Sequence, residues 1–265
     1  MDASLVAFAN HLADLATAET LPRFRTGLDV TDKGGAVYDP VTEADQEAER
    51  VIRAAIEARY PEHGIVGEEH GTVRADAEHR WVLDPVDGTR AFVTGCPSWT
   101  TLIALEQHGE PILGVIDQPY TGERWVGAGG RTLWRRAGEE RTVRARGTET
   151  FASARITCTD PFGTGFLSED EAAAFQEVAR QCQLSRFSLD AYGYGLLASG
   201  QFDLVVESSL KHYDYAALVP VVRGAGGVIT GWKGEPPQDS PRGRVVAAAT
   251  PALHAAAIEV LRRVE

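Results

Sequence analysis

The chain has 265 residues, of which 43% are hydrophobic, and its 26 Lys and Arg against 38 Asp and Glu give a formal net charge of −12. This composition supports a sizeable core in one compact unit or two apposed lobes, and the acidic balance argues against non-specific nucleic-acid binding. The three cysteines form no zinc or disulfide pattern, and no segment resembles a membrane span or a signal peptide. We therefore expect a cytoplasmic protein with no membrane partner and no nucleic-acid partner.

The first half is predicted to contain two helices and one sheet. Amphipathic spacing predicts a helix over residues 3–20. A second helix is predicted to begin at Thr42, which forms with Asp45 a pattern that resembles a capping box, and to end before Pro61. The segment 65–143 consists of short strand-like runs separated by turn signals, which predicts a largely antiparallel sheet covered by these helices. The expected strands are 81–83, 99–105, 112–116, 124–126 and 132–135.

The second half alternates strands with helices, which predicts an α/β lobe. Pro220 falls inside one expected helix, where it should remove a hydrogen bond and bend the axis. The predicted fold class is therefore α+β for residues 1–142, which carry most candidate metal ligands, and α/β for residues 143–265. The expected strands of the second lobe are 155–157, 202–207, 227–230 and 245–248, and its expected helices are 168–182, 191–198, 214–223 and 251–263.

Acidic residues follow the strand-like run 81–83 in a pattern that indicates a cation site. Asp84 and Asp87 flank a Pro-Val turn and precede a glycine, so both carboxylates and the Val86 carbonyl can face the same point. Two carboxylates about 4 Å apart repel by roughly 4 kcal/mol at an effective dielectric of about 20, so a site that gathers them needs a proton or a cation. Oxygen ligands without His or Cys favour Mg²⁺, Mn²⁺ or Ca²⁺ over zinc.

Two further acidic positions complete the candidate set. Glu68 lies in a Gly-Glu-Glu run of the first lobe, and Asp214 lies at the start of an expected helix of the second. A metal bound among Glu68, Asp84, Asp87 and Asp214 would bridge the lobes, where small-ligand clefts are common. Each patch alone is also consistent with an ordinary turn or a solvated loop. Their coincidence favours the metal site.

Four motifs follow one another along the chain. They are Lys33 with residues 39–45, residues 67–71, residues 81–92, and residues 213–217 with 224–227. In order and spacing they resemble the inositol monophosphatase family of Mg²⁺-dependent, lithium-sensitive phosphatases, although Asp39 stands where serine is commoner. The resemblance covers nearly the whole chain, and it implies a layered αβαβα sandwich and a homodimer.

Other segments resemble the histidinol-phosphate phosphatase branch of that family: residues 24–25, 101–105, 194–198, 203–207 and 213–220. One departure is that the Arg-Tyr-Gly-Gly-Asp run of the branch is here Arg-Phe-Ser-Leu-Asp, at residues 186–190. The reaction class is unaffected, but the identity of the alcohol stays open. Histidinol phosphate is the expected substrate, with myo-inositol monophosphate and 3′-phosphonucleotides as alternatives. A catalytically silent, metal-binding regulatory module is the alternative of a different class.

The resemblance implies two or three Mg²⁺ ions in the site, with Mn²⁺ as a substitute. Glu68, Asp84 and the Val86 carbonyl are assigned to the first metal, and Asp84, Asp87 and Asp214 to the second. Paired metals activate a water and stabilise the leaving oxygen, so no covalent phosphoenzyme is expected. The phosphorylated alcohol is therefore expected to be attacked directly by water.

Three residues are assigned catalytic roles. Glu68 and Thr89 are expected to orient the attacking water, with Glu68 as its base, and Asp45 is expected to assist that water or a third metal. Contacts with the substrate are expected from Glu68, Val86, Asp87, Gly88, Thr89, Arg186, Asp190, Glu207 and Asp214.

The organic half of the substrate is expected to meet Arg186, Asp190 and Glu207. Glu207 precedes Asp214 by seven residues, as the substrate-binding glutamate of the family does. A buried carboxylate beside an acidic site needs a cationic partner, which an amino-alcohol phosphate supplies. Arg186 could instead form only a surface ion pair. His212 is the best placed of the histidines, but it is expected to do no chemistry.

Overall fold

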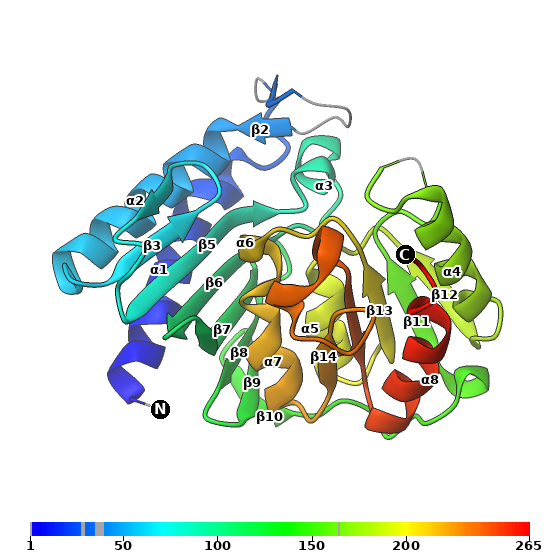
Figure 1. Cartoon of the computed structure of the whole chain (residues 1–265). Helices are drawn as coiled ribbons and strands as arrows, with labels where there is room; N and C mark the ends of the chain where they lie inside the picture. Colours follow the sequence, from blue (N-terminus) through cyan, green and yellow to red (C-terminus); the bar gives the residue numbers. More distant parts are fainter. Residues whose placement is uncertain (1, 28–29, 35–39, 164) are drawn as a thin grey trace.

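The computed structural model describes residues 2–27, 30–34, 40–163 and 165–265, and these residues form five layers (Figure 1). α1 (Ala3–Thr20) and α2 (Glu43–Arg59) cover one face of an eight-stranded sheet. α5 (Tyr192–Ala198), α6 (His212–Tyr215) and α7 (Leu218–Gly224) separate its other face from a five-stranded sheet. The outer face of that second sheet is covered by α4 (Glu169–Ala179) and α8 (Pro251–Leu261). The predicted αβαβα sandwich is confirmed.

The eight-stranded sheet has the order β10-β9-β8-β7-β6-β5-β3-β4 and is antiparallel except where β3 pairs with β5. The five predicted strands are present, most of them longer than expected. Three strands, β3, β4 and β10, were not predicted. Each is at most five residues long, and the side chains of β4 and β10 are largely exposed, so their sequences carry little apolar signal. The bounds are β3 (Gly64–Gly67), β4 (Gly71–Val73), β5 (His79–Asp87), β6 (Thr100–Gln107), β7 (Glu110–Gln118), β8 (Glu123–Ala128), β9 (Arg131–Arg136) and β10 (Glu139–Val143).

The five-stranded sheet has the order β12-β11-β13-β15-β14 and mixes parallel with antiparallel pairs. Its central strands β13 and β15 are buried along their whole length, in keeping with their nearly continuous apolar sequences. The edge strand β12, mostly exposed, was not predicted. The bounds are β11 (Arg155–Cys158), β12 (Leu184–Phe187), β13 (Leu204–Glu207), β14 (Val228–Thr230) and β15 (Val245–Ala248). The division of the chain between residues 142 and 143 stays a prediction.

The capping box at the start of α2 is confirmed. The Thr42 N–H donates to Asp45 Oδ2 at 2.9 Å, and the Thr42 hydroxyl donates to the same oxygen at 2.6 Å. Thr42 also ends the short strand β2 (Pro40–Thr42), which pairs with β1 (Val30–Asp32). Asp39, which departs from the first motif, lies outside the described residues.

The prediction of one bent helix around Pro220 was wrong. The segment forms two short helices, α6 and α7, and Pro220 is the third residue of α7. The first N–H groups of a helix have no partner within the helix, so proline is tolerated there without the loss of a bond. α7 then lies very close to the sheet, because a Cβ at Gly114 or Gly127 would overlap the backbone of Ala217 or Pro220. The connection between the two helices is thus fixed against β7 and β8.

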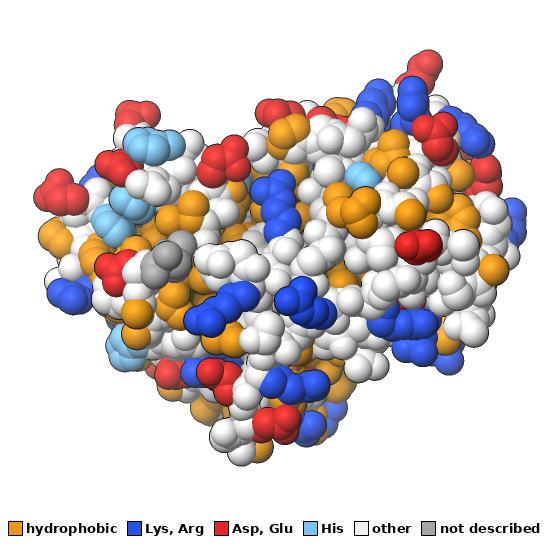
Figure 2. Space-filling model, turned by 90° about the horizontal axis from the view of Figure 1, so that it is seen from below, with side chains coloured by type: hydrophobic (Ala, Val, Ile, Leu, Met, Phe, Trp, Pro, Cys, Tyr) orange, Lys and Arg blue, Asp and Glu red, His pale blue; other side chains and the backbone are white. Residues whose placement is uncertain are grey.

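Charged side chains of both signs are interspersed on the face seen from below (Figure 2). Lys and Arg side chains lie near its middle, with Asp and Glu side chains beside them and along the margins. Among the described residues, no helix combines the length and the apolar character needed to cross a membrane.

Candidate active site

The carboxyl end of β5 brings two aspartates into one pocket. The pairing of β5 with β6 shifts register between Asp84 and Asp87, so the strand bulges between them. The Val86 N–H donates to Asp84 Oδ1 at 3.1 Å. Gly88 then turns the chain with a φ of 78°, which favours glycine, and α3 (Thr89–Thr94) begins after it. Both carboxylates line the same cavity as a result.

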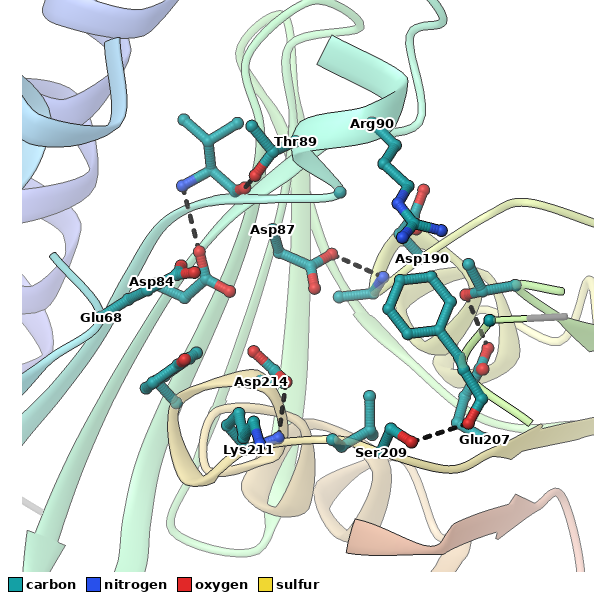
Figure 3. A pocket seen from close by; sticks show the side chains of 18 of the residues that line it. Glu68, Asp84, Asp87, Thr89, Arg90, Asp190, Glu207, Ser209, Lys211 and Asp214 are labelled. Carbon is teal, nitrogen blue, oxygen red and sulfur yellow. Dashed lines mark hydrogen bonds between the residues drawn. The ribbon is translucent and has the colours of Figure 1, made fainter. Parts of the chain in front are cut away.

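A third carboxylate, Asp214, comes from α6 in the second half of the chain. Its Oδ2 accepts a hydrogen bond from the Lys211 N–H at 2.6 Å, which caps the helix. Asp87 Oδ2 accepts from the Ala191 N–H at 2.8 Å, so the end of β5 is tied to the start of α5. Asp84, Asp87 and Asp214 each place an oxygen within 4.8 Å of the others (Figure 3).

Among the described residues, no ion pair neutralises these three carboxylates, although the charge of Lys211 partly opposes the burial of Asp214. Of the ion pairs formed by the described residues, none includes Asp84, Asp87 or Asp214. Burial, followed by the charges of adjacent carboxylates, raises the pKa of Asp84 and that of Asp87 well above the usual range. Burial also raises the pKa of Asp214 to about 7. Three crowded oxygen donors of this kind fit a hard divalent cation such as Mg²⁺, Mn²⁺ or Ca²⁺.

Glu68 lines the same pocket but is paired with a lysine. Lys33 Nζ lies 2.9 Å from Glu68 Oε1 and 2.6 Å from Glu69 Oε1, so one ammonium group serves two carboxylates. Burial raises the pKa of Glu69 to about 7, although Lys33 opposes this rise. The sequence placed Lys33 in a motif but gave it no partner, because the contact joins segments more than 30 residues apart.

Thr89 lies between the β5 bulge and the start of α2. Its hydroxyl lies 3.1 Å from the Val86 carbonyl oxygen and 3.4 Å from Asp45 Oδ1. Asp45 is 1% exposed, and burial raises its pKa to about 6. Thr89 lines the pocket, whereas Asp45 lies behind it and does not. Asp45, the third residue of α2 and part of its capping box, thus contacts the Thr89 hydroxyl from the side away from the pocket.

Glu207 lies at the far side of the pocket, whose volume is about 300 Å³. It ends β13, is 4% exposed, and accepts a hydrogen bond from the Thr159 hydroxyl at 3.0 Å. Burial raises the pKa of Glu207 to about 8. A buried carboxylate whose pKa stays raised although Thr159 donates to it favours a ligand that brings positive charge or further hydrogen-bond donors.

Asp190 stands between Glu207 and the cluster of Asp84, Asp87 and Asp214 (Figure 3). Its φ of 48° is unusual for a residue with a side chain, and a Cβ at Gly88 would crowd its carboxylate. Ser98 Oγ lies 3.3 Å from Asp190 Oδ2. Burial raises the pKa of Asp190 to about 6, and the charge of Arg90 opposes this rise.

Arg186 is not brought to the pocket. It lies on the edge strand β12, is exposed, and donates from Nη1 to the carbonyl oxygen of Ser185 at 2.9 Å. The sequence could not show which side of β12 faces a ligand, because three of its four residues are exposed and leave no burial pattern. Ser188 and Leu189, which replace the glycine pair of the branch, also lie outside the pocket lining. Ser188 Oγ donates to the Thr159 carbonyl oxygen, and Leu189 packs against the core.

Arg90, Phe166 and Tyr194 are among the pocket residues that the sequence interpretation missed. Arg90, the second residue of α3, has its guanidinium 4.5 Å from the centre of the Phe166 ring. Tyr194 of α5 is 1% exposed, and its buried hydroxyl has no hydrogen-bond partner among the described residues. The position of Arg90 directly after the Asp-Gly-Thr motif was a usable signal. Phe166 and Tyr194 offered none, because each reaches the pocket through tertiary packing.

Comparison with known proteins identifies the family of the chain. The sequence model described as "Inositol monophosphatase family" matches residues 1–265. The chain is 43% identical over 231 residues to the chloroplastic bifunctional phosphatase IMPL2 of Arabidopsis thaliana, covering 86% of this chain and 64% of that protein. It is 33% identical over 234 residues to the histidinol-phosphatase of Streptomyces coelicolor, covering 86% of each.

A solved structure gives the same result. The inositol monophosphatase of Zymomonas mobilis superposes with a TM-score of 0.86 at 39% identity, covering 99% of this chain and 100% of that one. The match thus includes both sheets and all three helical layers. This chain belongs to the inositol monophosphatase family, whose members are metal-dependent phosphatases.

Proposed function

We propose that this protein is a Mg²⁺-dependent phosphatase that hydrolyses histidinol phosphate to histidinol. The observation that carries the proposal is one pocket with two acidic regions. Asp84, Asp87 and Asp214 form an oxygen cluster at one side, and Glu207 with Asp190 forms a second acidic wall at the other. The first region suits metal ions, and the second suits an alcohol that carries an ammonium group.

The metal ligands follow from the positions of the carboxylates. Glu68, Asp84 and the Val86 carbonyl are the proposed ligands of one Mg²⁺, and Asp84, Asp87 and Asp214 those of a second. A third ion or Mn²⁺ is compatible with the same oxygen donors. When bound, such a metal pair lowers the pKa of a water and stabilises the leaving oxygen.

The residues of the chain orient and deprotonate the water. The Thr89 hydroxyl, held near Val86 and Asp45, is placed to hydrogen-bond to the attacking water. Glu68 accepts the proton of this water. For this step the Glu68 carboxylate turns from Lys33, its partner at 2.9 Å, toward the metal-bound site. The N–H groups at the start of α3, those of Gly88 and Thr89, bind phosphate oxygens. The pocket needs no nucleophilic side chain, and no phosphoenzyme forms.

The acidic wall supports an amino alcohol as the substrate. The Glu207 carboxylate is buried and accepts from Thr159, and the half-buried Asp190 carboxylate lies near Ser98 and the charge of Arg90. Histidinol phosphate carries an ammonium group near its phosphate-bearing carbon, and inositol phosphate carries none. The replacement of the glycine pair by Ser188 and Leu189 leaves this volume open, because neither residue lines the pocket. We further expect a homodimer in the cytoplasm.

Inositol monophosphate is the second candidate substrate. It is favoured by the likeness to the Zymomonas mobilis enzyme, which is described as an inositol monophosphatase and is 39% identical. A 3′-phosphonucleotide and a catalytically silent regulatory role remain weaker alternatives. The regulatory role is disfavoured because the acidic cluster and Thr89 are both in place.

The test is a phosphate-release panel of histidinol phosphate, inositol monophosphate and a 3′-phosphonucleotide with saturating Mg²⁺. We expect the highest kcat/KM for histidinol phosphate, loss of activity in excess EDTA, and inhibition by Li⁺. Preference for inositol phosphate would overturn the substrate assignment alone. Absence of phosphate release from every substrate, with an Asp214→Asn variant as the blank, would overturn the phosphatase function.

A further inference from the structure

An ion pair with a buried carboxylate lies on the same face of the sheet as Asp84. Arg80 of β5 and Glu106 of β6 are directly opposite each other, with Arg80 Nη2 2.7 Å and Nε 3.2 Å from Glu106 Oε2. Side chains alternate along a strand, so Arg80 and Asp84 point to the same face. Glu106 is 1% exposed, and Arg80 already supplies the positive charge that its burial requires.

The second oxygen of Glu106 binds the helix that carries Asp214. His212 Nε2 lies 2.6 Å from Glu106 Oε1, and His212 is the first residue of α6. Asp214 follows two residues later and lies next to Asp84. α6 therefore lies beside β5 and β6 (Figure 1), with a polar attachment from His212 to Glu106, Tyr215 packed in the core, and Asp214 near the end of β5.

α6 cannot hold this position by its own hydrogen bonds. It has only four residues, and a helix of a single turn is unstable in isolation. Its N-terminal cap is the Asp214 side chain itself, which accepts from the Lys211 N–H. The carboxylate that would bind a metal is thus also part of the helix terminus, so any shift of α6 moves a ligand oxygen.

We propose that His212, through Glu106 and Arg80, positions Asp214 and thereby sets the affinity of the site for its divalent cation. The inference rests on the proposed metal-dependent function. His212 is a positioning residue, because its ring meets Glu106 and not the pocket. Its side chain is 32% exposed, and its removal leaves Glu106 paired with Arg80, so the overall fold does not depend on it.

The experiment measures Mn²⁺ binding to the whole protein by calorimetry, together with the Mg²⁺ dependence of phosphate release. For His212→Ala we expect a dissociation constant for Mn²⁺ about tenfold higher, as for the loss of one hydrogen bond to a charged group. The Mg²⁺ needed for half-maximal activity rises by a similar factor, while kcat at saturating Mg²⁺ stays within about threefold of wild type. His212→Gln, whose amide nitrogen can replace Nε2, restores the wild-type constants.

His254→Ala is the matched control. His254 lies in α8, and its Nε2 is 2.8 Å from Thr230 Oγ1 in the second sheet layer, far along the chain from every proposed ligand. This variant loses a comparable hydrogen bond and keeps the wild-type Mn²⁺ constant. If His212→Ala does not fold, His212→Asn, whose amide is too short to reach Glu106, takes its place.

Equal Mn²⁺ affinity in wild type and His212→Ala would overturn the inference. A loss of kcat at saturating Mg²⁺ with an unchanged Mn²⁺ constant would also overturn it, as would an equal loss of affinity in His254→Ala. Failure of the wild-type protein to bind Mn²⁺ would instead overturn the proposed function, so the two failures are distinguishable.

Discussion

Two groups of buried acidic side chains in this molecule differ in whether a cation accompanies them. Glu171 of α4 has a fully buried side chain that binds Arg244 Nε at 2.7 Å and Arg242 Nε at 3.1 Å. Burial alone would raise the pKa of Glu171, but hydrogen bonds from Arg244, the Ser168 N–H and Arg242 outweigh it and lower the pKa to about 2. Asp84 is buried to a similar degree and Asp87 is half-buried, yet the neighbours of both include carboxylates and burial raises the pKa values of both.

The difference separates a structural site from a candidate functional site. An acidic group whose charge is satisfied within the chain stabilises the fold. A cluster that leaves its charge unsatisfied costs stability, and such strain persists where a ligand compensates for it. The Glu171 network belongs to the first kind, and the Asp84, Asp87 and Asp214 cluster belongs to the second.

The largest effect is expected for Asp87→Asn, which removes one charge from the unsatisfied cluster. We expect kcat at saturating Mg²⁺ to fall by roughly a thousandfold, because a proposed metal ligand is lost. The melting temperature of the metal-free protein should stay equal or rise, since repulsion between carboxylates is reduced. Steady-state kinetics and thermal unfolding in EDTA measure both. A near-wild-type kcat would refute the ligand assignment.

Glu171→Ala should have the opposite pattern. Loss of one partner leaves Arg244 buried without its carboxylate, which typically costs about 3–5 kcal/mol. For a chain of this size that corresponds to a fall in melting temperature of roughly 6–20 °C. We expect kcat/KM at 25 °C to stay within about twofold of wild type for the protein that remains folded. A selective loss of activity without a loss of stability would show that the two groups are not separate in function.

Glu207→Gln tests the acidic wall of the pocket. Loss of a charged pair with the substrate typically costs about 2–5 kcal/mol in binding. We therefore expect the preference for histidinol phosphate over inositol phosphate to shrink at least about tenfold, mainly through KM. Activity toward inositol phosphate serves as the internal control. An unchanged ratio of the two kcat/KM values would remove Glu207 from the substrate site.

The smallest effect is expected for the stability of wild type and Glu171→Gln at acidic pH. The folded-state pKa of Glu171, about 2, lies below its ordinary value of 4.5, so its contribution to stability is complete above the ordinary value. That contribution is lost as the pH falls from about 4.5 toward 2. Melting temperatures measured across this range in EDTA should decline more steeply for wild type than for Glu171→Gln. Parallel curves would show that Glu171 does not contribute to acid sensitivity.

Much of this architecture could be predicted because it depends on local patterns. Helical periodicity located α1, and the Thr42 and Asp45 pair located the start of α2. Nearly continuous apolar runs located the central strands of both sheets, whose burial leaves a strong signal. The error at Pro220 arose because apolar residues continue across the break between α6 and α7. Nothing in the periodicity marks the break itself.

The candidate site was predictable only in part. The Asp-Pro-Val-Asp-Gly-Thr run restricts its own backbone, so the bulge that turns Asp84 and Asp87 toward one pocket is encoded locally. The pairing of Lys33 with Glu68 and that of His212 with Glu106 depend on the path of the whole chain. No spacing rule connects such distant residues. His212 was expected to do no chemistry, and its contact with Glu106 could not be foreseen.

The close approach of α7 to the sheet has a consequence for the genetics of this protein. Gly114 on β7 does not line the pocket, yet any side chain there would meet the backbone of Ala217, which joins α6 to α7. A substitution at Gly114 would push this junction outward and carry Asp214 with it. In a screen of random mutants for loss of function, changes at this remote glycine should therefore be recovered together with changes at the acidic cluster.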